Sequence, residues 1–286
     1  MLTHPSKLQK LVATIQKLYP KAYADSTWDN TGLLVDSSSP AATITSDPLK
    51  ILLTIDLTQS VVDEAIKSNT NLVLAYHPFI FRGLKSINQV DPQQQSLIKL
   101  IQSGISVYSP HTAIDAAIGG VNDWLVSGIS TNDADLKSKA VIEESKVTGV
   151  AKGVGMGRII TLASPISLNE AIKRIKEHLN IPFVQLATTE KDRNTEKIST
   201  IAVCAGSGGG LFKGVKADLF YTGELSHHEA LYFKESGASV IACNHSNTER
   251  GFLKVLKEQL NAEFSNEEES VEIEISKTDC DPYETV

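Results

Sequence analysis

The chain has 286 residues, of which 41% are hydrophobic and 21% are charged, values typical of a globular protein with a sizeable core. This length suggests one large domain or two medium ones. The formal net charge of −7 argues against direct binding to nucleic acid, which calls for a basic surface, and no apolar run is long enough to span a membrane.

The N-terminal segment, residues 1–24, carries four lysines and no acidic residue, with apolar residues at helical spacing. Two interpretations stay open: an amphipathic surface helix of the mature fold, or a mitochondrial transit peptide that lacks the usual arginines. The three scattered cysteines argue against a disulfide framework and favour a reducing compartment. We therefore expect a cytoplasmic protein, with a mitochondrial location as the alternative.

Strand-like and helix-like segments alternate along most of the chain. Short apolar runs predict strands at residues 51–56, 71–77, 105–110, 158–163, 199–206, 218–223 and 239–244. Amphipathic segments between them predict helices, for example SLNEAIKRIKEHLN, which opens with Ser167 and Glu170 in the pattern of a capping box. This alternation indicates βαβ units, so we predict an α/β fold with largely parallel sheets.

The polar segment at residues 130–146 has no clear apolar period and is the best candidate for a domain boundary. We therefore predict two interlinked α/β domains, an N-terminal one at 1–130 and a C-terminal one at 131–286. From Val271 onward apolar and acidic residues alternate, as they do in an edge strand. This final strand could return to the first domain.

Three predicted strands end in a histidine, namely His77, His111 and His245. The carboxyl ends of parallel strands line the crevice in which α/β proteins bind ligands. Two of these histidines have an acid four residues on, Asp115 after His111 and Glu249 after His245, and helical positions i and i+4 share one face. The convergence of imidazoles and carboxylates at strand ends predicts a metal site.

The same acids have a structural alternative. Thr112 with Asp115, and Ser246 with Glu249, each match a capping box, in which the acid only starts a helix. Spacing alone leaves the metal site and the two helix caps as equal interpretations.

Longer motifs match one family over nearly the whole chain: WDNTGLLV, DLTQSVVDEAI, YHPFIF, YSPHTAIDAAIGGVNDWL, the glycine stretch through Arg158, TGELSHHEA, HSNTER and DCDPYE. The chain resembles the Nif-three-like family, also called YbgI-like proteins or GTP cyclohydrolase I type 2 homologs, and is most similar to its eukaryotic branch. The resemblance implies two α/β domains, a dinuclear metal site in a cleft between them, and a toroidal homohexamer.

Carried over to this chain, the family's ligands are His77 and Asp115 for one ion, His245 for the other, and Glu249 bridging both. Bacterial relatives have two adjacent histidines where this chain has Tyr76 and His77. A neutral phenol is a poor ligand for a divalent ion, so the resemblance implies one tight site and a weaker second site. One imidazole with two carboxylates suits iron, zinc or manganese.

Other histidines have weaker assignments. We expect His111 and His228, together with Tyr76, to lie around the metal as second-sphere groups, with a plain helix start as the alternative for each histidine. His4 and His178 have the surroundings of surface residues.

Three functions follow from these observations. A metal-dependent hydrolase of a nucleotide-like or phosphoester substrate uses a divalent ion with open coordination positions. The second is a non-enzymatic interaction protein, because eukaryotic relatives are named for binding a transcriptional adaptor, and the acidic charge favours contact through proteins rather than DNA. The third is a metal buffer.

Overall fold

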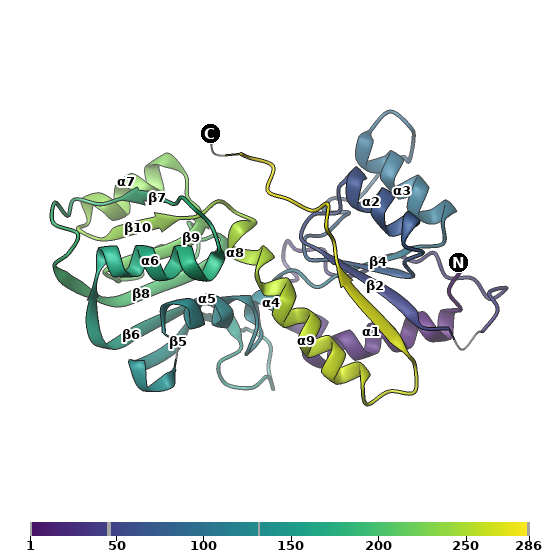
Figure 1. Ribbon diagram of the computed structural model, residues 1–286, viewed down its shortest axis with the longest axis horizontal. Coiled ribbons are helices and arrows are strands. Elements are labelled where there is room, and N and C mark those ends of the chain that lie inside the picture. Colours follow the sequence, from purple (N-terminus) through teal and green to yellow (C-terminus); the bar gives the residue numbers. More distant parts are fainter. Residues whose placement is uncertain (1, 45–46, 131, 285–286) are drawn as a thin grey trace. The chain divides into compact units, whose positions relative to one another are not determined.

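The structure is a computed structural model that describes residues 2–44, 47–130 and 132–284. It contains two compact units, shown in Figure 1. The first unit consists of the residues up to Ile114 together with Leu253–Cys280, and the second consists of Asp115–Phe252 together with the residues after Cys280. None of the helices described is both long enough and apolar enough to cross a membrane.

The first unit is built on a five-stranded sheet in the order β1-β4-β3-β2-β11. The β1–β4 pair is antiparallel, and the other three pairs are parallel. Its elements are α1 (Pro5–Leu18), η1 (Lys21–Tyr23), β1 (Gly32–Val35), β2 (Leu49–Thr54), α2 (Gln59–Lys67), β3 (Leu72–Ala75), α3 (Pro92–Gln102), β4 (Ser106–Ser109), α9 (Phe252–Phe264) and β11 (Val271–Ile275).

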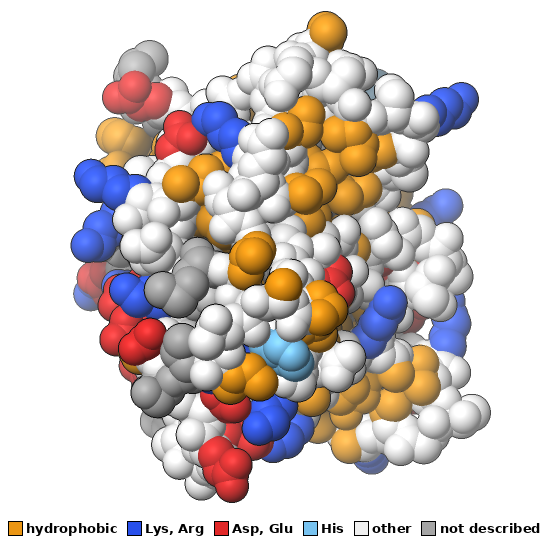
Figure 2. Space-filling model, turned by 90° about the vertical axis from the view of Figure 1, so that its right-hand side faces the viewer, with side chains coloured by type: hydrophobic (Ala, Val, Ile, Leu, Met, Phe, Trp, Pro, Cys, Tyr) orange, Lys and Arg blue, Asp and Glu red, His pale blue; other side chains and the backbone are white. Residues whose placement is uncertain are grey.

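Helices cover both faces of this sheet, α2 and α3 on one side and α1 and α9 on the other (Figure 1). Every residue of β3 and β4 is buried, which explains the continuous apolar sequence of β3. Helix α1 buries Leu8, Leu11 and Ile15, the apolar residues of the basic N-terminal segment. The face of this unit in Figure 2 also shows apolar side chains gathered between charged ones.

The second unit is built on a six-stranded sheet in the order β5-β6-β8-β9-β10-β7. The β8–β9 and β9–β10 pairs are parallel, and the other three are antiparallel. Its elements are α4 (Thr112–Ala116), which begins in the first unit, α5 (Val121–Ile129), η2 (Asp133–Asp135), β5 (Leu136–Glu144), β6 (Gly155–Ser167), α6 (Leu168–Leu179), β7 (Gln185–Ala187), β8 (Glu196–Ser207), β9 (Leu219–Glu224), α7 (His227–Glu235), β10 (Ser239–Ala242) and α8 (Asn247–Arg250).

One face of this second sheet carries an aromatic cluster. Phe233 of α7 stacks on Phe220 of β9 with ring centroids 4.1 Å apart, and Phe212 lies 5.1 Å from Phe220. Helices α5 and α6 pack against each other and against β6 and β8. Strand β9 is buried along its length except for its last residue, Glu224, which is exposed at the carboxyl edge of the sheet.

The predicted α/β fold is confirmed, with mixed sheets in which parallel pairs dominate only the first. The predicted edge strand from Val271 is confirmed as β11, which pairs with β2. The polar segment at residues 130–146 contains strand β5, which was not among the predicted strands. Lys137–Ala140 on this edge strand are all exposed, so the alternation that marks a half-buried strand is missing.

His178 was predicted to be a surface residue, and that prediction is wrong. Its ring lies 4.4 Å from the Trp124 ring of α5, and its Nε2 atom is buried without a hydrogen-bond partner among the described residues. A Cβ at Gly128 would come within 2.3 Å of the His178 ring, so the glycine permits this close helix contact. Burial lowers the pKa of His178, and a backbone hydrogen bond with Trp124 opposes this only in part.

This half-buried imidazole should make the folding free energy depend on pH. Because the folded-state pKa is below the unfolded value of about 6.5, the stabilisation is present above pH 6.5 and is lost as pH falls through the folded pKa. Chemical denaturation between pH 7.5 and 5 should show this loss in the wild type and a smaller loss in His178→Phe, which keeps an aromatic ring but cannot be protonated. If the unfolding free energies of the wild type and of His178→Phe depended equally on pH, the lowered pKa of His178 could not be the cause.

Candidate functional site

His77 lies just beyond the carboxyl end of β3, and its backbone N–H donates to the Ile55 carbonyl at 3.1 Å. Its Nδ1 atom is 2.9 Å from Oδ1 of Asp56, which follows the neighbouring parallel strand β2. Sequence analysis missed Asp56. When Nδ1–H donates to this carboxylate, Nε2 is the ring nitrogen directed toward ligand binding, as is usual for metal-binding histidines.

Two further predicted residues lie beside His77 in the same unit. The His111 ring centroid is 5.5 Å from that of His77 and 5.9 Å from that of Tyr76, with edge-on geometry in both cases. The backbone N–H of His111 donates to the Tyr76 carbonyl. Tyr76 itself is only 1% exposed. The structure thus brings together the tyrosine and both histidines that the sequence placed at adjacent strand ends.

Asp29 of the WDN segment holds His111 in place. Its Oδ1 atom lies 2.8 Å from His111 Nδ1, and its Oδ2 atom accepts hydrogen bonds from the backbone N–H and the hydroxyl of Thr112. Burial favours the neutral acid, but the hydrogen bonds from His111 and Thr112 outweigh it and lower the pKa of Asp29. His111 has a φ of +36°, an unfavourable backbone conformation for a non-glycine residue that this network maintains.

In the second unit, His245 and Glu249 lie at the carboxyl end of β10 and in the short helix α8. His245 Nε2 is 3.3 Å from Glu249 Oε1, and the Glu249 side chain is only 3% exposed. His245 Nδ1 is 2.9 Å from Oε1 of Glu224, which ends the parallel neighbour β9. Both predicted ligand histidines therefore have a carboxylate on Nδ1, supplied by the adjacent parallel strand.

Gly206, the next-to-last residue of β8, keeps space open at these ligand atoms. It has a φ of +61°, and a Cβ built on it would lie 2.7 Å from His245 Nε2 and 2.9 Å from Glu249 Oε1. Any larger residue would meet both atoms and would also strain the backbone. A glycine at this position is consistent with a site that must admit an ion between imidazole and carboxylate.

Asp115 lies in α4 at the start of the second unit. Burial raises the pKa of the Cys204 thiol, and the negative charges of Asp115 and Glu249 raise it further. Both carboxylates are therefore within electrostatic reach of one buried thiol, which stays protonated at neutral pH. The structure places two of the predicted acidic ligands in the same part of this unit.

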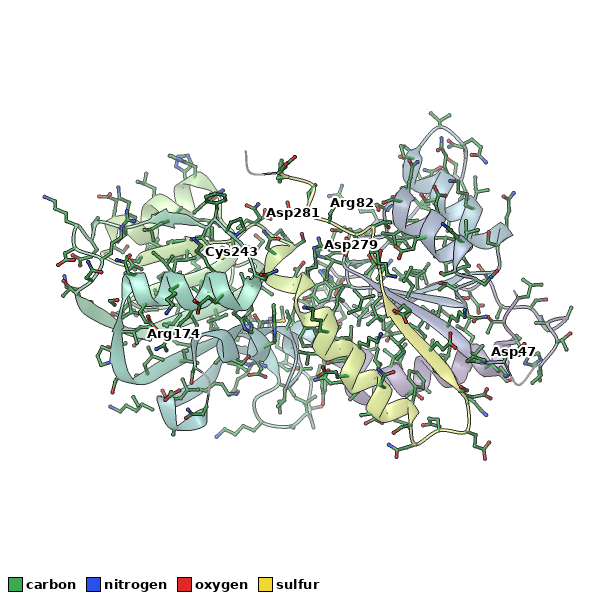
Figure 3. The ribbon with its side chains drawn as sticks, in the orientation of Figure 1. Asp47, Arg82, Arg174, Cys243, Asp279 and Asp281 are labelled. Carbon is green, nitrogen blue, oxygen red and sulfur yellow. The ribbon has the colours of Figure 1, made fainter. Side chains whose placement is uncertain are left out.

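The capping-box alternative for Glu249 is not realised. The Ser246 hydroxyl makes no cap hydrogen bond; it donates to Asp281, labelled in Figure 3, and accepts from the Arg250 guanidinium. At the other junction the Thr112 hydroxyl donates to Asp29. The only complete capping box among the described helices starts α7, at Ser226 and Glu229.

His228 follows Ser226 in the opening turn of α7. It is exposed, and its ring contacts that of His227 with a centroid distance of 5.3 Å. Its second-sphere role stays a prediction.

Among the described residues, His77, His245 and Glu249 make up a set of donors that could hold a metal ion. Asp115 is not part of this set. Two imidazoles and one carboxylate fit zinc, iron(II) or manganese, and the carboxylates on Nδ1 of both histidines are the outer partners that such ligands usually have. The residues present thus fit a divalent metal.

Comparison with known proteins gives one consistent result. The family model described as Duf34/NIF3 (NGG1p interacting factor 3) matches residues 6–282. NGG1-interacting factor 3 of Saccharomyces cerevisiae is 49% identical, covering 97% of this chain and 96% of its own. The NIF3 homolog of Schizosaccharomyces pombe is 45% identical, with 98% of each chain covered.

Solved structures agree with these relatives. A hypothetical protein of Staphylococcus aureus has a TM-score of 0.81 at 27% identity, covering 98% of this chain and 99% of its own. Reduced HcgD from Methanocaldococcus jannaschii has a TM-score of 0.73 at 24% identity, covering 94% of this chain and 97% of its own, a likeness that extends to the fold alone.

Proposed function

Because the chain belongs to the Duf34/NIF3 family, we propose that it binds a divalent metal ion through His77, His245 and Glu249, with Asp115 as a fourth ligand. We propose further that it is a metal-dependent hydrolase of a nucleotide-like or phosphoester substrate. The observation that supports metal binding most directly is common to His77 and His245. In each, a carboxylate lies at hydrogen-bond distance from Nδ1, which leaves Nε2 as the ligand atom.

A bound divalent ion would supply a Lewis acid that activates water and polarises the group under attack. The protein's own contribution is positional. Asp56 and Glu224 orient the two imidazoles, and Gly206 leaves room beside His245 and Glu249.

The activity test uses purified protein of known metal content and a panel of nucleotides and phosphoesters. Turnover that is lost both on chelation and in His77→Ala supports the hydrolase. Binding of metal without turnover on any substrate would contradict the hydrolase while leaving the metal site intact.

Tyr76 should limit the protein to one tightly bound ion per chain. The buried phenol lies next to His77, where an imidazole would be a far better ligand. Elemental analysis after gel filtration should give close to one ion for the wild type and for Tyr76→Phe, and a value rising toward two for Tyr76→His. Two tightly held ions in the wild type would contradict this role of Tyr76.

A second candidate function is supported by the 49% identical relative, which is named for interacting with NGG1. In this alternative the chain is a non-enzymatic partner of a transcriptional adaptor, with or without a role as a metal buffer. Purified chain and the NGG1 counterpart of its own organism would be tested for direct binding. Association without turnover on any substrate favours this function.

We also propose that the chain assembles into a toroidal homohexamer in the cytoplasm, with a mitochondrial location as the alternative. Light scattering at micromolar concentration should give the mass of six chains. The mass of a monomer would contradict the hexamer.

A further inference from the structure

The side chains of the WDN segment, Trp28, Asp29 and Asn30, make hydrogen bonds that the proposed metal binding does not explain. Asp29 holds His111, and its two neighbours hold other groups. The Asn30 side-chain amide donates to the Ile80 carbonyl, and the Trp28 indole N–H donates to Oδ2 of Asp25 at 2.9 Å. Three consecutive side chains thus fasten three different parts of the first unit.

The result is a pair of exposed aromatic rings in fixed positions. Trp28 is 52% exposed and Phe81 is 46% exposed, yet their ring centroids are only 6.1 Å apart. The hydrogen bond to Asp25 fixes the indole, and the Asn30 bond fixes the backbone immediately before Phe81. Aromatic rings held rigid while open to solvent lose little conformational entropy when a ligand stacks on them.

The Trp28 ring contacts His111, which in turn contacts the predicted ligand His77. The Trp28 ring centroid is 5.7 Å from that of His111, and the His111 centroid is 5.5 Å from that of His77. Trp28 is therefore one ring contact from His111 and two from His77, so a ring stacked on Trp28 would bind in the same part of this unit as the proposed metal ligand.

The residue that follows Phe81 in the sequence is a cation, Arg82. Arg82, labelled in Figure 3, is exposed and makes no hydrogen bond or ion pair with any residue that the structure describes. An exposed guanidinium one residue from an exposed aromatic ring is suited to a ligand that joins a planar ring to a phosphate, because it binds phosphate oxygens in a bidentate manner.

We propose that Trp28 and Phe81 form a stacking surface for a planar heteroaromatic ring, and that Arg82 binds a phosphate attached to it, so that the ligand is a nucleotide. This inference rests on the proposed function, since it names the substrate class and the residues that bind it. Stacking on aromatic side chains is tolerant of base identity, so the surface defines the class rather than one base.

The test measures binding of nucleotides to the full-length protein by calorimetry, both as purified with metal and after chelation. The probes are the four nucleoside 5′-monophosphates, guanosine, and ribose 5-phosphate. Nucleotides should bind in both states, and ribose 5-phosphate should bind much more weakly because it has no ring. Nucleotide binding that persists after chelation would support this inference independently of the metal. Failure of the metal proposal would instead show as a low metal content of the purified protein.

Matched variants locate the surface. Trp28→Ala and Phe81→Ala should each weaken nucleotide binding roughly 5- to 100-fold, whereas Trp28→Phe should stay within about threefold. Arg82→Gln should weaken binding of nucleotides but not of guanosine. Val90→Ala, at an 89% exposed apolar residue of the same loop, is the control and should change nothing.

Two results would overturn the proposal. One is the absence of nucleotide binding at millimolar concentration in the wild type. The other is unchanged nucleotide binding in Trp28→Ala and Phe81→Ala, which, if accompanied by altered light scattering, would assign the rings to a contact with another protein chain.

Discussion

Glu249→Gln should leave the fold intact and remove most of the bound metal. The Glu249 carboxylate is buried beside His245 Nε2, and the capping box that could have given it a purely structural role does not form. A glutamine has nearly the same shape but replaces an anionic oxygen donor with a neutral amide. We expect metal affinity to fall by at least the 10- to 100-fold that loss of an outer partner typically costs. Elemental analysis and thermal melting measure the two quantities separately.

Two variants of nearby residues serve as comparisons for the loss of metal in Glu249→Gln. Glu224→Gln removes the carboxylate from Nδ1 of His245 and should weaken metal binding less than Glu249→Gln. Ser246→Ala deletes the hydroxyl that bonds Asp281 and Arg250, so it should lower stability by about 1 kcal/mol and leave the metal bound. Unchanged metal content in Glu249→Gln would remove Glu249 from the ligand set.

His77 and His245 could be placed at strand ends because each follows a short, mostly apolar strand. In β3 and β10 the run of apolar residues ends within a few positions of His77 and His245, so strand and exit point could both be recognised. The domain boundary at residue 130 stays a prediction.

The outer carboxylates were missed because they are defined by strand pairing rather than by local spacing. Asp56 and Glu224 each precede their histidine by 21 residues, the length of one strand–helix–strand step. A usable signal existed: in both cases an acid stands at the end of the preceding parallel strand. Recognising it requires the prediction that consecutive strands are neighbours in the sheet.

The close contact between helices α5 and α6 also could not be predicted from local sequence patterns. His178 follows Lys176 and Glu177 and has the sequence context of a surface residue. Its burial depends on Gly128, fifty residues earlier, which has no side chain to hold α5 away from α6. The exposed strand β5 was missed for the opposite reason, because pairing with β6 stabilises it without an apolar face.

Arg158→Met should lower the free energy of unfolding by about 3–5 kcal/mol, far more than the substitution Ser246→Ala. The Arg158 side chain is only 2% exposed, and its Nε and one terminal nitrogen each donate at 3.0 Å to the two oxygens of Asp123. The guanidinium also donates to the carbonyls of Gly155, Gly157 and Ala117. Burial disfavours the charged form of Asp123, but hydrogen bonds from Arg158 dominate and lower its pKa.

Removing the arginine takes two donors from the mostly buried Asp123 carboxylate, which keeps Lys139 Nζ at 3.2 Å and the Gly119 N–H at 2.9 Å, and it takes a donor from each of three carbonyls. Methionine cannot replace any of the lost bonds. Denaturant unfolding measures the loss, and Arg174→Met is the matched control because its pairing with Glu170 is a surface contact of one helix, 34% and 38% exposed. The control should lose roughly 0.5–1.5 kcal/mol, including its bond to the Ile129 carbonyl. In Arg158→Met combined with Asp123→Asn the loss should be smaller than the sum of the single losses, since the second change removes the mostly buried charge that the first leaves without its arginine partner. A loss below about 1 kcal/mol in Arg158→Met would show that water reaches Asp123 and that the network contributes little to folding.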